Sequence, residues 1–162
     1  MLQRIAKDGN CFYRAISHQL ALHQIFIDHI KIRRKTCDLI KENSETYSNF
    51  LEDLTIGEYM EKQSSDGFWA DYVAIYASSR ALNFSLLVFD KTGLRNEFNL
   101  SGNPKLKIFY KNENHFESII DLDICVENKI IEFQISTPLN EKFLSTYIKK
   151  RYFLSYCKKY SK

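Results

Sequence analysis

Residues that break regular structure are scarce in this chain of 162 residues, which holds five glycines and two prolines. That scarcity excludes a collagen-like or low-complexity chain. Long apolar runs are absent as well, since none approaches the ~20 residues that a membrane-spanning helix needs. The first ten residues also lack the apolar stretch of a secretory signal peptide. We therefore expect a soluble cytoplasmic protein without a transmembrane segment.

Paired cysteines are a further absence. The four cysteines stand at positions 11, 37, 125 and 157, and no two form the Cys-x-x-Cys pattern of a zinc knuckle or a thioredoxin-type site. Without a secretory signal, disulfides are not expected either. We therefore predict free thiols, and neither a metal site nor a cofactor. Cys37, Cys125 and Cys157 are interpreted as non-catalytic.

Most of the chain also lacks a strong charge of one sign. The net charge is +3, but residues 149–162 hold six basic residues and no acidic one, which leaves 17 basic against 20 acidic residues elsewhere. A surface that binds nucleic-acid phosphates usually spreads its cations over the fold. We therefore expect no nucleic-acid partner.

The chain does contain enough apolar material for a core, with 44% hydrophobic residues, among them 12 Phe and 10 Tyr. Apolar spacing predicts helices first and strands later. The helices are expected over 11–20, 25–43, within 44–63 and over 66–82, and the strands over 84–90, 95–100, 106–110 and 115–119. This order predicts an α+β fold of three-layer α/β/α type, with a small central sheet flanked by helices.

Two parts of the chain are expected. Residues 1–124 form the core, and residues 125–162 form an extension with a strand over 127–135 and a basic amphipathic helix over about 137–158. The apolar stripe of that helix predicts packing on the core, and binding to a partner or to a membrane is the alternative.

The chemically informative stretch is Asp8-Gly9-Asn10-Cys11-Phe12-Tyr13-Arg14-Ala15-Ile16. In physical terms, a glycine-containing loop leads into a helix whose first turn carries a thiol. Unpaired backbone N–H groups and the positive end of the helix dipole stabilise a thiolate there and can hold an oxyanion. Cys11 is therefore a candidate nucleophile that needs a base from elsewhere in the chain.

His115 is the candidate base. It follows a polar loop and starts an apolar strand, and Glu117 stands two residues later. Side chains two residues apart in a strand project from the same face, so Glu117 can accept the imidazole N–H and fix its tautomer. From the spacing alone, a structural role for Cys11 and His115 stays open. The other three histidines lack the spacing of a helical zinc site.

The stretch from Asp8 to Ile16, together with the later Asn114-His115-Phe116-Glu117-Ser118, resembles the ovarian tumour (OTU) family of cysteine proteases. These proteins are deubiquitinases with a papain-like catalytic logic. Their signature is an Asp-Gly-Asn-Cys loop entering a helix, with Arg-Ala after two apolar or aromatic residues, and an aromatic residue after the histidine. Residues 67–90 also resemble the family's tryptophan-containing helix and buried strand. The likeness spans about residues 2–120.

The resemblance implies a thiol hydrolase of papain-like OTU fold that cleaves isopeptide bonds after the C-terminal Gly-Gly of ubiquitin. Its partners would be ubiquitin or polyubiquitin chains. Cys11 would be the nucleophile and His115 the general base and acid. The oxyanion hole would consist of the backbone amides of Asp8, Gly9, Asn10 and Cys11.

One position departs from the family pattern. The residue two places after the histidine is usually Asp or Asn, and Glu117 stands there in this chain. We rank Glu117 first as the residue that orients His115. Asp8 ranks second, because some family members use the acid of the cysteine loop.

The resemblance also suggests where substrate binds. Trp69, Asn114 and Phe116 are assigned to substrate binding, and a core aromatic is the alternative for Trp69. Residues 25–62 and 91–105 are expected to form the surface for the distal ubiquitin.

An active deubiquitinase is the leading interpretation. A catalytically inactive OTU-like module that binds ubiquitin or another partner is the alternative, and a Cys–His acyltransferase is a third. We expect a monomer. The Ile-, Lys- and Asn-rich composition is typical of an A/T-rich genome, which favours a bacterial effector acting in a host cytosol over a viral or eukaryotic protein. The chain could also be the excised catalytic domain of a longer protein.

Overall fold

The computed structural model describes residues 1–51, 54–112 and 114–121. The chain divides into two compact units, residues 1–120 and 121–162. All the helices and strands described below belong to the first unit. The predicted strand over 127–135 and the predicted basic helix over 137–158 lie outside the described residues.

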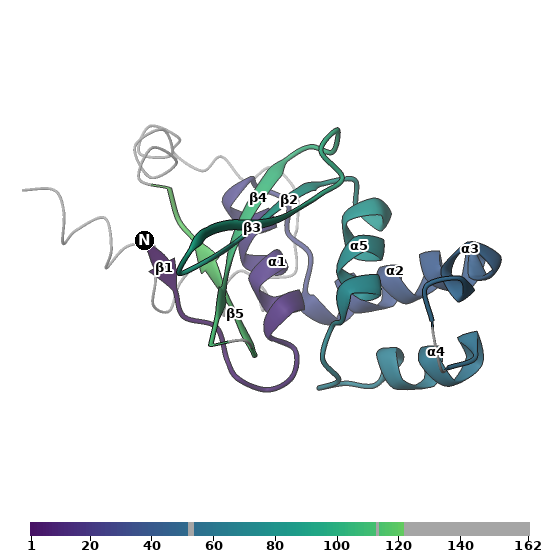
Figure 1. The fold of residues 1–162 in the computed structure, drawn as a ribbon. Helices are drawn as coiled ribbons and strands as arrows, with labels where there is room; N and C mark the ends of the chain where they lie inside the picture. The colour runs from purple at the N-terminus through teal and green to yellow at the C-terminus, as the bar shows by residue number, and fades with distance from the viewer. Residues whose placement is uncertain (52–53, 113, 122–162) are drawn as a thin grey trace, which may run out of the picture. The chain divides into compact units, whose positions relative to one another are not determined.

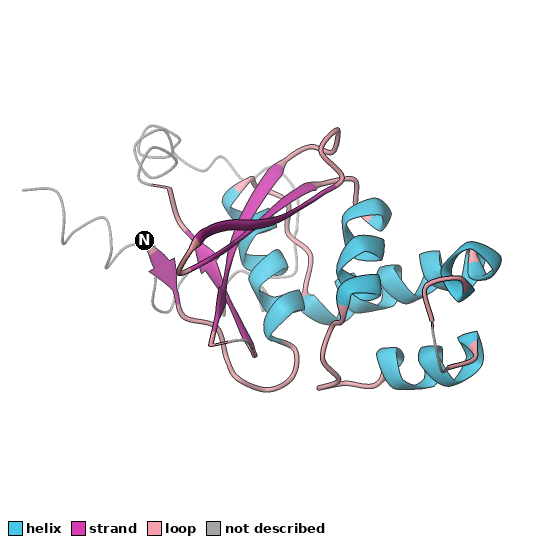
Figure 2. Ribbon diagram, in the orientation of Figure 1, coloured by secondary structure: helices cyan, strands magenta, loops and turns pink. Residues whose placement is uncertain are grey.

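A five-stranded mixed sheet forms one side of the first unit, and most of the helices lie on the other side (Figures 1 and 2). In spatial order, its strands are β1 (Leu2–Gln3), β5 (His115–Ile119), β4 (Lys105–Lys111), β2 (Ser85–Asp90) and β3 (Gly93–Phe98). Strands β2 and β4 run parallel, and the other neighbours run antiparallel.

The register of β4 against β5 decides which side chains share a face near the start of β5. Lys111 lies opposite His115, and Phe109 lies opposite Glu117. Because directly opposed residues of an antiparallel pair project to the same side, His115, Glu117 and Lys111 share one face of the sheet.

Five helices accompany the sheet in the described part of the chain. They are α1 (Cys11–Leu22), α2 (His29–Glu42), α3 (Ser44–Ser48), α4 (Ile56–Ser64) and α5 (Tyr72–Ala81). Helix α1 packs against β4 and β5, whereas α2 packs against α1, α4 and α5. Figure 1 shows α3 and α4 at the end of this unit that is remote from the sheet. None of the described helices is long and apolar enough to cross a bilayer.

Side-chain caps set the starts of three helices. Asp28 accepts a hydrogen bond from the Lys31 amide, so α2 begins at His29 and not at residue 25 as predicted. Thr55 and Glu58 form a capping box at the start of α4. Asp71 accepts a hydrogen bond from the Ala74 amide at the start of α5.

The predicted start of the helix over 66–82 is wrong. Gly67 adopts a left-handed φ of +79°, which an α-helix excludes, and the cap at Asp71 delays the helix until Tyr72. Residues 66–71 therefore form a loop, and Trp69 stands on this loop with 57% of its surface exposed. The core-aromatic alternative for Trp69 is excluded by that exposure.

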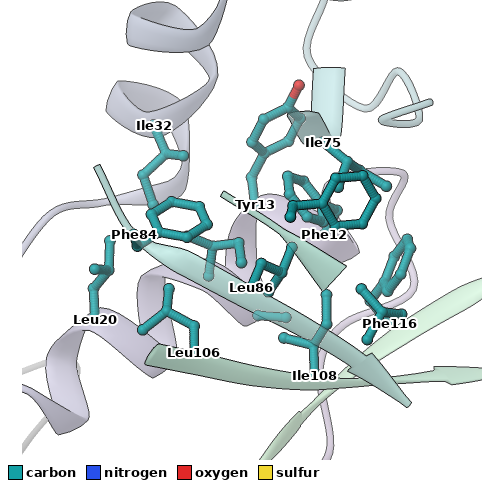
Figure 3. Close-up of a cluster of buried hydrophobic side chains, with 14 of the residues drawn as sticks. Phe12, Tyr13, Leu20, Ile32, Ile75, Phe84, Leu86, Leu106, Ile108 and Phe116 are labelled. Atoms are coloured by element: carbon teal, nitrogen blue, oxygen red, sulfur yellow. The ribbon is translucent and has the colours of Figure 1, made fainter. Parts of the chain in front are cut away.

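The main core lies between α1 and the sheet (Figure 3). Its largest buried side chains include Phe12, Tyr13 and Ile16 from α1 and Leu86, Leu106 and Ile108 from the sheet. Phe12 also meets Phe116 of β5 edge to face, with ring centroids 5.6 Å apart. This contact joins the first turn of α1 to the start of β5.

A buried polar side chain adds a second link between α1 and the sheet. The Gln19 Nε2 donates to Ser118 Oγ at 2.7 Å and to the Ile119 carbonyl at 2.6 Å, and its Oε1 accepts from the Lys107 amide at 2.8 Å. A buried amide that satisfies three groups at once fixes one relative position of the elements. The predicted α+β class with a small sheet and packed helices is confirmed. Strand β1 was not predicted, because two residues are too few to show alternation.

Candidate active site

A cavity of about 280 Å³ opens at the N-terminal end of α1. Its walls come from the start of α1, the 69–75 segment, strands β2 and β3, and the hairpin that joins β4 to β5. Four of the predicted site residues line it, namely Cys11, Trp69, Asn114 and Phe116. Residues far apart in the sequence therefore meet at one concave site.

Cys11 is the first residue of α1, and 7% of its surface is exposed. Asn10 occupies the N-cap position, but its side chain makes no capping hydrogen bond. The first amides of α1 are therefore left without a side-chain acceptor, at the positive end of the helix dipole. These amides can bind an oxyanion close to Cys11.

Two glycines bring the cysteine loop against the loop that carries Trp69. Gly9 has a φ of +75°, and a Cβ added to it would lie 1.7 Å from the Gly67 carbonyl oxygen. Gly67 also has a positive φ, and its added Cβ would lie 3.3 Å from the Asp8 carbonyl oxygen. The two backbones therefore touch, and only glycine fits at position 9.

Asp8 shapes the cysteine loop through its side chain. One carboxylate oxygen accepts from the Asn10 amide at 3.1 Å, and the other pairs with the Arg14 guanidinium at 2.6 Å. Burial alone would raise the pKa of Asp8, but the hydrogen bonds from Arg14 and Asn10 outweigh burial and hold this pKa below its ordinary value. The amide of Asn10 therefore donates to Asp8, whereas the amides of Gly9 and Cys11 donate to no acceptor among the described residues.

His115 begins β5 and is 97% buried, since only 3% of its surface is exposed. Burial lowers the pKa of its imidazole, and the charges of Lys7 and Lys111 lower it further. The charge of Glu117 and a hydrogen bond to the Ile5 backbone act in the opposite direction without cancelling the shift. The lowered pKa favours the neutral form of His115, which is the form that a general base requires.

Glu117 is buried beside His115 but has another partner. Its Oε1 accepts from Lys111 Nζ at 3.1 Å, and this ion pair lies on the same face of the sheet as His115. Within the described residues, no hydrogen bond joins His115 to Cys11, Glu117 or Asp8. The group that contacts the imidazole is the Ile5 backbone.

Several residues that shape this site were not predicted. The most prominent is Arg33 of α2, whose buried guanidinium donates to Asn10 Oδ1 at 2.7 Å. The others are Ile5, Gly67 and Lys111. The glycine in Asp66-Gly67 is a turn signal that could have moved the predicted start of the helix to a later residue. No local signal in the sequence indicates the contacts of Ile5, Lys111 or Arg33.

Comparisons with known proteins bear on this geometry. A family model described as OTU-like cysteine protease matches residues 6–120. OTU domain-containing protein 4 of Mus musculus is 22% identical over 148 residues, which cover 90% of this chain and 13% of that protein. Ubiquitin thioesterase otu2 of Schizosaccharomyces pombe is 28% identical over 104 residues, which cover 60% of this chain and 35% of that protein. This chain therefore matches only a minor part of either relative.

The fold is similar to that of solved OTU domains. The solved structure of an ovarian tumor (OTU) domain in complex with ubiquitin superposes with a TM-score of 0.62 at 18% identity. The match covers 72% of this chain and 67% of that chain. At this identity the likeness establishes the shared fold.

Proposed function

The chain belongs to the OTU-like cysteine protease family, and from this premise we propose that it is an active deubiquitinase with Cys11 as its nucleophile. The observation that carries the proposal is the position of Cys11, at an uncapped helix N-terminus on the wall of the cavity. The match of the family model to residues 6–120 includes both Cys11 and His115.

The proposed reaction is hydrolysis of the isopeptide bond that follows the ubiquitin C-terminus. His115 takes the thiol proton, and Cys11 Sγ forms a bond to the carbonyl carbon of the terminal glycine. The carbon–nitrogen bond then breaks, and His115 returns the proton to the leaving lysine amine. Water attacks the resulting thioester and restores the free thiol.

The tetrahedral oxyanion would be bound by backbone amides of the cysteine loop. Because the Asn10 amide already donates to Asp8, we assign this role to the amides of Gly9 and Cys11. A donor of this kind contributes about 10²–10³ in turnover. Asp8 then acts by shaping the loop, which its two hydrogen-bonded partners support.

Glu117 remains the proposed acid that orients His115. Its charge raises the pKa of His115, which is the effect expected of a carboxylate that stabilises an imidazolium. In this arrangement the Lys111 ammonium shares the same carboxylate. The Ile5 backbone, in the segment that follows β1, holds the ring from another side.

Ubiquitin is the proposed substrate. The solved OTU domain with this fold is a complex with ubiquitin, and the fission-yeast relative is named a ubiquitin thioesterase. We propose that the C-terminal glycines enter the cavity between Trp69 and Asn114. Both side chains are exposed, so an incoming chain can contact them.

A ubiquitin-binding module without activity is the second candidate. The observation that favours it is the pairing of Glu117 with Lys111, which leaves His115 without a carboxylate hydrogen bond among the described residues. An inactive module would still offer the same cavity to a ubiquitin tail.

A ubiquitin probe with a C-terminal alkyne electrophile distinguishes the two candidates. Wild type, Cys11→Ala and the matched control Cys37→Ala are each incubated with the probe and analysed by intact mass. An adduct on wild type and Cys37→Ala, and none on Cys11→Ala, supports the enzyme. Binding of unmodified ubiquitin to wild type without adduct supports the module. If a folded wild type forms no adduct and does not bind ubiquitin, the proposal that ubiquitin is the ligand is overturned.

A further inference from the structure

Arg33 is a charged residue in an interior position. It stands on α2 with 5% of its surface exposed. In the described part of the chain no carboxylate pairs with it. A buried cation without a counter-ion is costly unless several acceptors surround it. Its partners therefore indicate why it is there.

The guanidinium donates three hydrogen bonds to oxygen atoms. Nη1 donates to the Gln63 carbonyl at 2.8 Å, and Nη2 donates to the Phe68 carbonyl and to Asn10 Oδ1, both at 2.7 Å. Its Cζ lies 4.3 Å from the centroid of the Tyr13 ring, which covers it as a cation–π partner.

These three acceptors come from the cysteine loop, from the last turn of α4 and from the 66–71 loop, whose neighbours Cys11 and Trp69 line the cavity. Asn10 precedes the nucleophile Cys11, whereas Gln63 and Phe68 flank the segment that leads to Trp69. Asn10 Oδ1 also accepts from the Gly67 amide at 3.1 Å, and Gln63 Nε2 donates to the Trp69 carbonyl at 3.2 Å. One guanidinium thus holds both sides of a single cleft.

We propose that Arg33 is a positioning residue that fixes the amides of the cysteine loop against the Trp69 loop. It contacts neither the sulfur nor the substrate. It acts through Asn10. Its guanidinium donates a hydrogen bond to the Asn10 side chain, and Gly9 and Cys11 are the chain neighbours of Asn10. The expected effect on kcat rests on the proposed hydrolase function. The expected ordering of the two loops does not depend on that function.

Lysine cannot replace Arg33 in this role. The planar guanidinium reaches acceptors in different directions at once, whereas an ammonium is a single point on a flexible stem. Arg33→Lys retains the charge and most of the volume, but it gives up part of the connection between Asn10, Gln63 and Phe68. Arg80 is the matched control, because it is an exposed arginine on α5 and lies outside the segments assigned to ubiquitin binding.

The kinetic test uses a ubiquitin C-terminal coumarin amide with wild type, Arg33→Lys and Arg80→Lys. We expect Arg33→Lys to lower kcat by about 10- to 100-fold, the range that a misplacement near 1 Å or a lost oxyanion donor produces. KM should change by less than about threefold. Alkylation of Cys11 by iodoacetamide, which needs no oxyanion hole, should also change by less than about threefold. Arg80→Lys should match wild type in all three.

A second readout does not depend on activity. Hydrogen exchange is measured for peptides that cover residues 8–12 and 66–70 in the same proteins. We expect about tenfold or more faster exchange in both peptides of Arg33→Lys, with the β4–β5 peptides unchanged. If wild type shows no hydrolysis, the proposed function fails, and exchange still decides the role of Arg33.

A double-mutant cycle with Asn10→Ala tests the route of the effect. If Arg33 acts through Asn10, the loss of kcat in Asn10→Ala with Arg33→Lys should be clearly smaller than the product of the two single losses. Three results would overturn the proposal: unchanged exchange in both loops of folded Arg33→Lys, an equal fall in kcat and in alkylation, or strictly multiplicative losses in the cycle.

Discussion

Substitution of Gly9 by alanine tests the contact between the two loops most directly. The added Cβ would lie 1.7 Å from the Gly67 carbonyl oxygen. Carbon and oxygen atoms that are not bonded approach to about 3.3 Å at closest, so the loops must separate by about 1.5 Å. Alanine is also strained at the φ of +75° that position 9 adopts.

The size of the effect follows from these two terms. The left-handed conformation costs about 1–2 kcal/mol for a residue with a Cβ, and forced separation of packed groups costs about 1–3 kcal/mol. We therefore expect the free energy of unfolding to fall by about 3 kcal/mol and Tm by about 6–12 °C. A shift of this size beside Cys11 should also lower kcat about 100-fold.

Two other glycines provide graded controls, and thermal denaturation with the coumarin-amide assay measures all three. Gly67→Ala has the same strain at φ +79° but a contact of 3.3 Å, so it should cost about 1–2 kcal/mol. Gly57→Ala lies in α4 with no contact closer than 3.9 Å, so it should be neutral or stabilising by up to about 1 kcal/mol. If Gly9→Ala has the same Tm and the same turnover as wild type, the close packing of the two loops is refuted.

Three further predictions concern titration. The acid limb of kcat/KM against pH should have its midpoint below 6.5, because burial lowers the pKa of His115, and a midpoint above 6.5 would contradict this. Glu117→Gln should move that midpoint lower still and reduce kcat roughly tenfold or more, since the Glu117 charge raises the pKa of His115; an unchanged profile would exclude Glu117 as the orienting acid. His18 is held neutral by burial, which lowers its pKa to about 4. The unfolded chain therefore binds more protons below pH 6.5, and stability should fall by about 2 kcal/mol between pH 7 and pH 5 in urea titrations. His18→Asn should lose that part of the pH dependence, and an equal dependence in both proteins would count against it.

The proposed nucleophile and base could be identified in the sequence because each stands in a short contiguous stretch. The Asp8–Cys11 loop is a contiguous motif, and the strand that starts at His115 has the predicted bounds. Cys11, Trp69 and Asn114 line one cavity, and their roles stay predictions. Whether His115 and Glu117 act as proposed is a matter for the experiments above.

The remaining features depend on contacts between distant segments. Arg33 lies within the buried stripe of α2, together with Ile32, Thr36, Cys37 and Ile40. A long arginine side chain can extend its charge to solvent or keep it inside, and periodicity does not distinguish the two. The acceptors that decide the matter lie 23 to 35 residues away from it. The partner of Glu117 likewise depends on the register of β4 and β5, which the pattern of either strand alone leaves open.

The strand order has a consequence for the timing of activity. Strand β5 lies between β1 and β4, so the strand that begins with His115 enters the sheet between partners from opposite ends of the described sequence. During synthesis from the N-terminus, Cys11 and α1 emerge about a hundred residues before His115 is made. The thiol is therefore without its proposed base until the last described strand has been inserted. In a nascent chain the nucleophile would stay latent, and proteolytic competence would arise together with completion of the sheet.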